Sequence, residues 1–222
     1  MPGATPLMRL YARRRVRALA RQDPVADQKA LLHWLLLRAR ATRFGRAHGF
    51  EHILETNNHH LLAAYRERVP LRTYEDFWSE WWQNAYPVLE NETWPGRIPA
   101  FAITSGTTSG TTKNIPVSAE MLKMQRRAAL DVVAYHLAHR PDSRLFGGKL
   151  FMLGGSTDLE RPAPGVVRGD LSALAVADTP LWVRPFAFPP RNLALMKDWQ
   201  EKVDVLARRS LKHDVRALSG TP

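Results

Sequence analysis

The sequence predicts an α/β protein, in which a mainly helical N-terminal layer at residues 1–92 precedes a layered α/β region at residues 93–222. The first region carries segments with helical start and stop signals, whereas the second alternates short apolar runs with helical segments. Such an alternation is typical of a layered α/β domain. An apolar content of 45% over 222 residues is enough to bury one sizeable core or two small ones.

Three segments of the N-terminal region are expected to be helices. They are residues 23–45, 57–70 and 73–87. In the first segment, Asp23 stands at the N-cap, Pro24 at the first helical position and Gly45 at the expected end. In the third segment, Thr73 is expected to cap the helix, with Asp76 at the acidic position of a capping box.

Short apolar runs in the second region are expected to form strands. They are residues 98–103, 114–117, 149–153, 171–177, 181–186 and 215–218. The runs at 171–177 and 181–186 are the weaker strand candidates. Helices are expected from the N-cap Ser118 to about Arg140, with apolar residues at helical spacing, and over residues 192–209.

The formal net charge of +11 is carried in part by the first 22 residues, which contain six arginines and no acidic residue. Three interpretations are open: a solvated basic helix face, a patch for nucleic acid or anionic lipid, and a targeting segment. We favour the solvated face. No zinc finger, aromatic RNA-binding signature or basic zipper follows, so no specific nucleic-acid partner is expected.

The residue types that the chain lacks limit its chemistry. It contains no cysteine, which excludes disulfides and thiolate catalysis and fits a reducing compartment, so a cytoplasmic location is expected. The apolar run from Leu31 to Leu37 is too short to span a bilayer, and no membrane span is expected. The eight histidines do not form a set of three converging ligands, so no metal site is expected from them.

One stretch suggests a binding function. Residues 104–112 are only Thr, Ser or Gly, and Lys113 follows them. A flexible linker is the simpler interpretation, but the stretch is short, lies between two expected strands and leads into a capped helix. We therefore interpret residues 104–113 as a phosphate-binding loop. The glycine spacing fits neither the Walker motif nor the dinucleotide fingerprint.

Each residue type in this loop suits an anion. Gly106 and Gly110 allow the backbone to turn and approach a ligand closely, and the exposed N–H groups of such a turn bind anions. Lys113 would add a positive charge. The hydroxyl groups of the loop are further donors to phosphate oxygens. They belong to Ser105, Thr107, Thr108, Ser109, Thr111 and Thr112.

The run "TSGTTSGTTK" resembles the phosphate-loop signature of adenylate-forming enzymes. It differs from that signature by an extra residue before the second glycine and by Thr112 in place of a proline. These differences, with other stretches, resemble the auxin-responsive-promoter family of acyl-acid amido synthetases. The stretches are "TRFGRAHGF" at 42–50, "VPLRTYEDF" at 69–77, "FAITSGTT" at 101–108 and "LSGTP" at 218–222.

The resemblance implies the incomplete N-terminal segment of an adenylate-forming large domain, with the C-terminal domain absent. It implies ATP-dependent activation of a small carboxylic acid, with Mg²⁺, and transfer of the acyl group to an amine or amino acid. It also implies that Ser105, Thr107 and Thr108 contact phosphates, that Gly106 and Gly110 shape the loop, and that no side chain is a covalent nucleophile. The 222 residues alone are expected to bind nucleotide weakly at most and not to catalyse the reaction.

Two other questions stay open on the sequence. An acyl-CoA-type ligase shares the same first step, and a non-catalytic nucleotide- or partner-binding remnant would keep the same loop. The carboxylate of the acid could meet Lys123, Arg126 or Arg127 on the helix after Ser118, although a solvated helix face explains each of these cations more simply.

Overall fold

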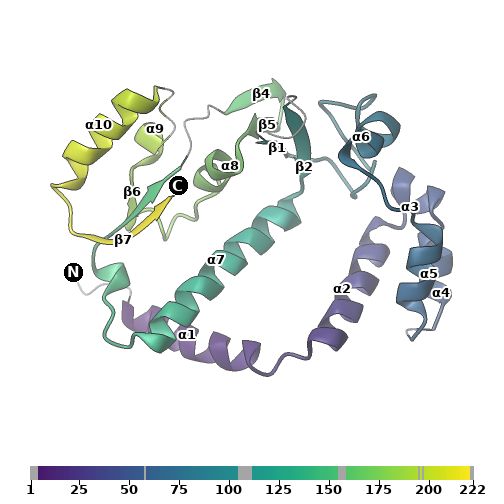
Figure 1. Cartoon of the computed structure of the whole chain (residues 1–222), viewed down its shortest axis with the longest axis horizontal. Helices are drawn as coiled ribbons and strands as arrows, with labels where there is room; N and C mark the ends of the chain where they lie inside the picture. The colour runs from purple at the N-terminus through teal and green to yellow at the C-terminus, as the bar shows by residue number, and fades with distance from the viewer. Residues whose placement is uncertain are drawn as a thin grey trace. The chain divides into compact units, whose positions relative to one another are not determined.

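The structure is a computed structural model that describes residues 5–57, 59–104, 112–154, 159–194, 196 and 198–220 (Figure 1). The chain divides into two compact units. Residues 21–99 make up the helical unit, and residues 1–20 and 100–222 make up the α/β unit. The N-terminal basic segment therefore belongs to the α/β unit, where its helix packs.

The helical unit consists of short helices around an aromatic core. Its elements are α2 (Pro24–Ala39), α3 (Arg43–Ala47), α4 (Phe50–Glu55), α5 (Leu61–Arg68), α6 (Tyr74–Phe77) and the π-helical turn η1 (Trp78–Trp82). The buried residues of the core come from most of these elements. They are Leu36, Ala39, Phe44, Phe50, Ile53, Leu61 and Trp81.

The helix that we expected over residues 23–45 is two helices. Asp23 caps α2, as predicted, by accepting from the backbone N–H groups of Val25 and Ala26. The helix then ends at Ala39, and α3 starts after Thr42. The Thr42 hydroxyl donates to the Ala39 carbonyl at 2.7 Å and accepts from the Gly45 N–H at 3.0 Å, so one buried side chain ends one helix and begins the next.

The α/β unit contains two sheets among its described residues. The strands are β1 (Ala100–Thr104), β2 (Lys113–Val117), β3 (Lys149–Leu153), β4 (Glu160–Ala163), β5 (Val166–Gly169), β6 (Ala187–Phe188) and β7 (Val215–Gly220). One sheet has the order β2-β1-β5-β4, and the other has the order β6-β3-β7 with all its neighbours parallel. The mixed α/β fold class predicted from the sequence is confirmed.

Helices flank both sheets (Figure 1). They are α1 (Thr5–Leu19), α7 (Ala119–His139), the 3₁₀ turn η2 (Leu145–Gly147), α8 (Leu171–Ala177), α9 (Arg191–Ala194) and α10 (Trp199–Ser210). Met8 and Ala12 of α1 are buried against Ala134 and Leu137 of α7. Ser118 caps α7, as predicted, and accepts from the Met121 N–H at 3.1 Å.

Three expectations for the α/β unit are wrong. Residues 171–177 form the helix α8 and not a strand, because Asp170 accepts from the Ala173 N–H at 2.6 Å and nucleates a turn of helix-favouring residues. Residues 181–186 form hydrogen-bonded turns, with Pro180 before them and Pro185 within them. The helix expected over 192–209 is divided into α9 and α10, the latter capped by Asp198.

A buried lysine joins α10 to the second sheet. Lys202 is 1% exposed, and its ammonium group donates to the carbonyl oxygens of Gly154 at 3.1 Å and Ala194 at 2.7 Å. Burial lowers the pKa of Lys202, because an apolar environment disfavours the charged form, while Asp170 acts in the opposite direction. These bonds fix α10 against the end of β3 and the end of α9.

Candidate functional site

The strands on either side of the Thr/Ser/Gly stretch are paired with each other. β1 and β2 are antiparallel over five residue pairs, from Ala100 opposite Val117 to Thr104 opposite Lys113. Residues 105–112 therefore connect two hydrogen-bonded strand ends within one sheet. The stretch therefore does not connect two separately packed segments, which a linker between domains would do.

Most predicted site residues lie outside the described part of the chain. Ser105, Gly106, Thr107, Thr108 and Gly110 fall in the range 105–111, which the structure does not describe. The sixth predicted residue is described: Lys113 is half-buried and is the first residue of β2, opposite Thr104. The structure thus places the lysine at the base of the loop.

The base of the loop is a packed strand pair. Side chains alternate between the faces of a strand, so Thr104 and Lys113 continue the row of Ala100, Ala102 and Val117. The last three are buried with Leu174 of α8. The strand ends that carry the loop therefore belong to a sheet whose one face is covered by a helix, which fixes where the loop begins and ends.

The opposite face of this sheet carries a polar network that sequence reasoning missed. Arg168 of β5 donates through Nε to the Asn114 side chain at 2.7 Å and through a terminal nitrogen to Glu160 at 2.5 Å. Arg168 therefore joins β5 to β4 and to β2 beside the loop. The run of residues 166–169 is only four long, and its arginine interrupts the apolar pattern, so it gave no strand signal.

The cations on α7 that could meet a carboxylate are not equivalent. Arg126 forms an ion pair with Asp178, which follows α8, so its charge is already compensated within the α/β unit. No ion pair is found for Lys123 or Arg127 among the described residues. Lys123, Arg126 and Arg127 stand at positions i, i+3 and i+4 of α7, which are neighbours on a helix surface, and within the described residues Arg126 is the one with an ion pair.

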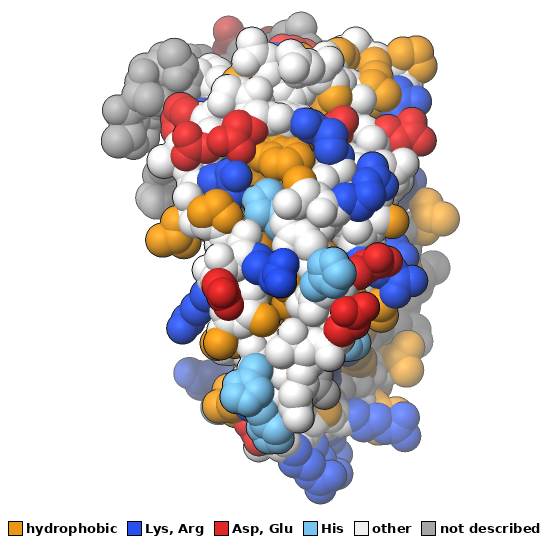
Figure 2. Space-filling model, turned by 90° about the vertical axis from the view of Figure 1, so that its right-hand side faces the viewer, with side chains coloured by type: hydrophobic (Ala, Val, Ile, Leu, Met, Phe, Trp, Pro, Cys, Tyr) orange, Lys and Arg blue, Asp and Glu red, His pale blue; other side chains and the backbone are white. Residues whose placement is uncertain are grey.

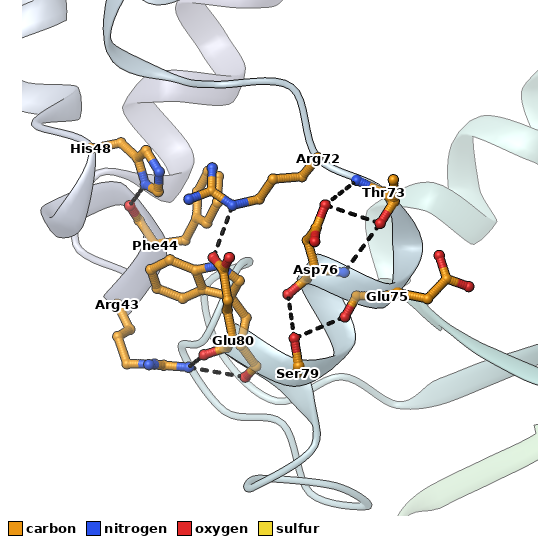
Figure 3. A network of polar contacts seen from close by, with 10 residues as sticks. Arg43, Phe44, His48, Arg72, Thr73, Glu75, Asp76, Ser79 and Glu80 are labelled. Carbon is orange, nitrogen blue, oxygen red and sulfur yellow. Dashed lines mark hydrogen bonds and ion pairs between the residues drawn. The ribbon is translucent and has the colours of Figure 1, made fainter.

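The stretch "TRFGRAHGF" organises the core of the helical unit. Phe44 stacks on His48 with ring centroids 4.1 Å apart and meets Trp81 edge-on at 4.9 Å. The Arg43 guanidinium lies 4.5 Å from the centre of the Trp81 ring and donates to the carbonyl oxygens of Glu80 and Trp81. His48 is buried, and its Nδ1 lies 2.9 Å from the Phe44 carbonyl oxygen (Figure 3).

The stretch "VPLRTYEDF" also has a structural role. Thr73 and Asp76 form a reciprocal capping box at the start of α6, as predicted (Figure 3). Hydrogen bonds from the Thr73 backbone and hydroxyl lower the pKa of Asp76. Arg72 pairs with Glu80 at 2.9 Å. The printed contacts of both stretches lie within the helical unit, where they serve in packing and helix capping.

The charged groups do not form a metal site in the described part of the chain. Within those residues, no group of three or more His, Cys, Asp and Glu side chains is placed to hold a metal ion. On the face shown in Figure 2, acidic and basic side chains are intermixed over most of the surface. This face therefore differs from the single-sign patch that recognition of a nucleic-acid backbone requires.

The fold and the loop position define a mixed α/β protein with a helical N-terminal unit and a Thr/Ser/Gly-rich hairpin connection. The chain belongs to the GH3 family: residues 15–165 match the profile described as GH3 family N-terminal domain. The family inferred from the sequence motifs is thereby confirmed.

A solved structure supports the fold. The chain is similar to a GH3.15 acyl acid amido synthetase, with a TM-score of 0.63, 19% identity and coverage of 83% of this chain. It spans 31% of the length of that relative. No match was found among curated proteins. In the described helices, none is both long enough and apolar enough to cross a membrane.

Proposed function

We propose that this chain forms part of an acyl-acid amido synthetase, which activates a carboxylic acid with ATP and transfers the acyl group to an amine or amino acid. Membership of the GH3 family supports the proposal. The observation that carries it is the loop of residues 105–112, rich in hydroxyl groups and glycine, held between the paired ends of β1 and β2. The absence of cysteine fits a cytoplasmic location, which we also propose.

The proposed reaction has two steps. The carboxylate oxygen attacks the α-phosphorus of ATP, and the bond to pyrophosphate breaks, which yields an acyl-adenylate. The amine then attacks the acyl carbon, loses a proton, and AMP leaves. Both reactants of the first step are anionic, so the protein contributes mainly by positioning them and by neutralising charge.

The loop residues would provide both contributions. In this proposal, Ser105, Thr107 and Thr108 donate hydrogen bonds to phosphate oxygens, and Gly106 and Gly110 bring backbone N–H groups close to them. Lys113 adds a positive charge at the base of the loop, where β2 fixes its backbone. A packed sheet below the loop would keep these donors in place when the phosphates arrive.

The described residues are compatible with Mg²⁺ that arrives already bound to the phosphates of the nucleotide. They offer no cluster of three acidic or histidine ligands, and Mg²⁺ in such sites is commonly held by phosphates, waters and one or two carboxylates. The hydroxyl groups of Thr107 and Thr108 are the loop groups that we propose to face it. When bound, Mg²⁺ would supply further neutralisation of the phosphate charge.

Binding of ATP to the 222-residue chain tests the loop assignment. Thr107→Val and Lys113→Ala should each weaken binding by about tenfold, as expected for the loss of a hydrogen bond to a charged group. Lys29→Ala removes an exposed lysine of α2 and serves as the matched control. Isothermal titration calorimetry gives the affinities, and circular dichroism checks the fold. Unchanged affinity in both loop variants would contradict the assignment.

The reaction is tested separately in the longest native polypeptide that contains this chain. Exchange of labelled pyrophosphate into ATP, dependent on an added carboxylic acid, is the expected result. Product analysis with amino acids and with coenzyme A as acceptors then distinguishes an amido synthetase from an acyl-CoA ligase. Nucleotide binding without any exchange would favour the non-catalytic alternative.

A further inference from the structure

The outward face of α1 is partly apolar. Leu7 and Leu10 are 71% and 50% exposed, although another face of the same helix is packed: Met8 and Ala12 are buried against α7. The outward face of a surface helix is normally charged or polar. Within the described part of the chain, the fold therefore leaves two large apolar side chains of α1 uncovered.

The two leucines border a groove that a second segment completes. Trp182, which is 46% exposed, and Phe186 line the groove from the turns at residues 181–186, and its volume is about 540 Å³. Leu181, the residue before Trp182, is 74% exposed. Two segments far apart in the sequence thus bring exposed apolar side chains together, and contiguous apolar surface of this kind marks interaction sites.

Arginines continue the same face of α1. Leu7, Leu10, Arg14 and Arg17 follow one another at spacings of three, four and three residues, so they share one face of the helix. Arg14 also lines the groove. Both arginines are exposed, and neither forms an ion pair with a described residue.

Acidic residues do not offset this charge. Neither of the two segments, residues 1–22 and 179–197, contains Asp or Glu. Asp131 of α7 is bound to Arg15 at 2.6 Å, and Asp178, just before the second segment, is likewise bound to an arginine of α7. The exposed surface around the groove therefore combines apolar side chains with uncompensated positive charge.

We propose that this surface binds a lipid bilayer that contains anionic lipids. The α1 patch, as we call it, consists of Leu7, Leu10, Arg14, Arg17 and Trp182. The two leucines and the Trp182 ring enter the edge of the hydrocarbon region, and the arginines stay at the level of the lipid phosphates. Helices that lie in the plane of a membrane interface divide their side chains in this way, and tryptophan is enriched at that depth.

Other occupants match the α1 patch less well. A nucleic-acid backbone would pair with the arginines and leave the leucines and Trp182 in water. An acidic protein partner would offer carboxylates at fixed positions, whereas no described contact holds Arg14 or Arg17 in a fixed orientation. The diffuse negative charge of a lipid surface requires no such orientation.

Co-sedimentation of the 222-residue chain with vesicles tests the proposal. One set of vesicles is phosphatidylcholine alone, and the other contains about 30% phosphatidylserine, both at an ionic strength of about 0.15 M to screen distant charges. We expect at least about tenfold stronger binding to the anionic vesicles. Leu7→Gln/Leu10→Gln and Arg14→Gln/Arg17→Gln should each weaken that binding by at least about tenfold.

Two further variants locate the contact. Arg208→Gln/Arg209→Gln removes the same charge from an exposed part of α10 and should weaken binding by less than about twofold. Trp182→Phe keeps an apolar ring and should keep most of the binding. Brominated acyl chains should quench the tryptophan fluorescence of the bound wild type, and this quenching should largely disappear in Trp182→Phe.

Several results would overturn the proposal. One is failure to bind either kind of vesicle. Another is binding to anionic vesicles that the leucine variant leaves unaltered, because net charge alone would then cause the adsorption. A third is a dimer in sedimentation velocity that Leu7→Gln/Leu10→Gln dissociates, because the patch would then bind a second copy of the chain.

The substitutions lie at exposed positions, and circular dichroism checks that each variant folds. If the leucine variant does not fold, the quenching of Trp182 decides the question. None of these measurements involves ATP, so the result is independent of the test of the proposed function.

Discussion

At the scale of single residues, the turn between α2 and α3 depends on close packing around Gly45. A Cβ atom at this position would lie 2.1 Å from the Ala39 carbonyl oxygen, which belongs to the backbone and cannot rotate away. The same carbonyl accepts the hydroxyl of Thr42. The glycine therefore allows two helices to meet around one buried hydrogen bond.

The variant Gly45→Ala should lower the free energy of unfolding by about 1–3 kcal/mol, because the added methyl group must displace backbone. Urea denaturation measures the change. Gly147→Ala is the control: its Cβ would lie 3.5 Å from the nearest atom, the Cβ of Arg144, which is an ordinary contact. A Gly45→Ala protein as stable as the wild type would mean that α2 and α3 can separate without cost.

Residues that assemble a site by tertiary packing gave no sequence signal. The phosphate-binding loop was predicted because its hydroxyl-bearing residues are consecutive in the sequence, and the structure places Lys113 at the start of β2, next to that stretch. Arg126 was a candidate for the acid on position alone, but it pairs with Asp178, 52 residues further along the chain. Leu10 and Trp182 lie in segments that were considered as a basic segment and as a strand, and the fold brings them to one groove.

At the scale of elements, α1 shows how a basic segment is used in the fold. Arg15 makes a two-pronged ion pair with Asp131 of α7, with distances of 2.6 and 2.8 Å. Both side chains are about one fifth exposed, at 19% and 21%. One of the six N-terminal arginines therefore ties two helices together, while Arg13, Arg14 and Arg17 are not buried.

The contribution of the Arg15–Asp131 ion pair to stability should depend on pH. The hydrogen bonds from Arg15 lower the pKa of Asp131, and burial opposes them. A carboxyl group with a lowered pKa in the folded state stabilises that state above its unfolded pKa of about 3.9, and the contribution is lost as the pH falls through the lowered value. The pair should thus stabilise the protein at neutral pH and not in strong acid.

Asp131→Asn should lower the free energy of unfolding by about 1 kcal/mol at pH 7, the upper range for partly exposed pairs. The difference from wild type should shrink as the pH approaches the lowered pKa. Denaturation curves at several pH values measure it, and Asp142→Asn, an exposed change after α7, is the control. A difference that stays constant down to strong acid would show that Asp131 acts through packing and not through its charge.

Local signals predicted elements well where caps and apolar runs agree. Ser118 and α7, and the strands β1, β2, β3 and β7, lie where the pattern places them. The run 171–177 was misassigned because it is short and mostly apolar, a pattern that does not distinguish a buried strand from a buried helix. The deciding group is Asp170, which lies just outside the run and caps a helix. Side-chain capping outweighed the apolar pattern there.

At the scale of the whole molecule, each compact unit has its own core. The tryptophans are distributed unequally between them. Those in the helical unit are Trp34, Trp78, Trp81, Trp82 and Trp94, and those in the α/β unit are Trp182 and Trp199. Tryptophan fluorescence therefore reports mainly on the helical unit, whereas helical circular dichroism reports on both.

Unfolding followed by the two signals should not coincide, because separate cores need not unfold as one cooperative unit. Urea titrations that record both signals on the same samples test this expectation. Gly45→Ala should shift the fluorescence midpoint more than the midpoint of the circular dichroism change. Superimposable curves for wild type and variant would show a single cooperative transition and contradict the expectation.

The pairing of Thr104 with Lys113 has an evolutionary consequence. Because the strand ends are hydrogen-bonded to each other, residues inserted or deleted between them leave the register of β1 and β2 unchanged. Lengthening a connection whose ends are already joined costs only a fraction of a kcal/mol, about 0.6 per doubling. The hairpin thus makes loop length a variable that mutation can explore without disturbing the sheet. Lineages that share this sheet can therefore differ in the length of this connection by small insertions at one place.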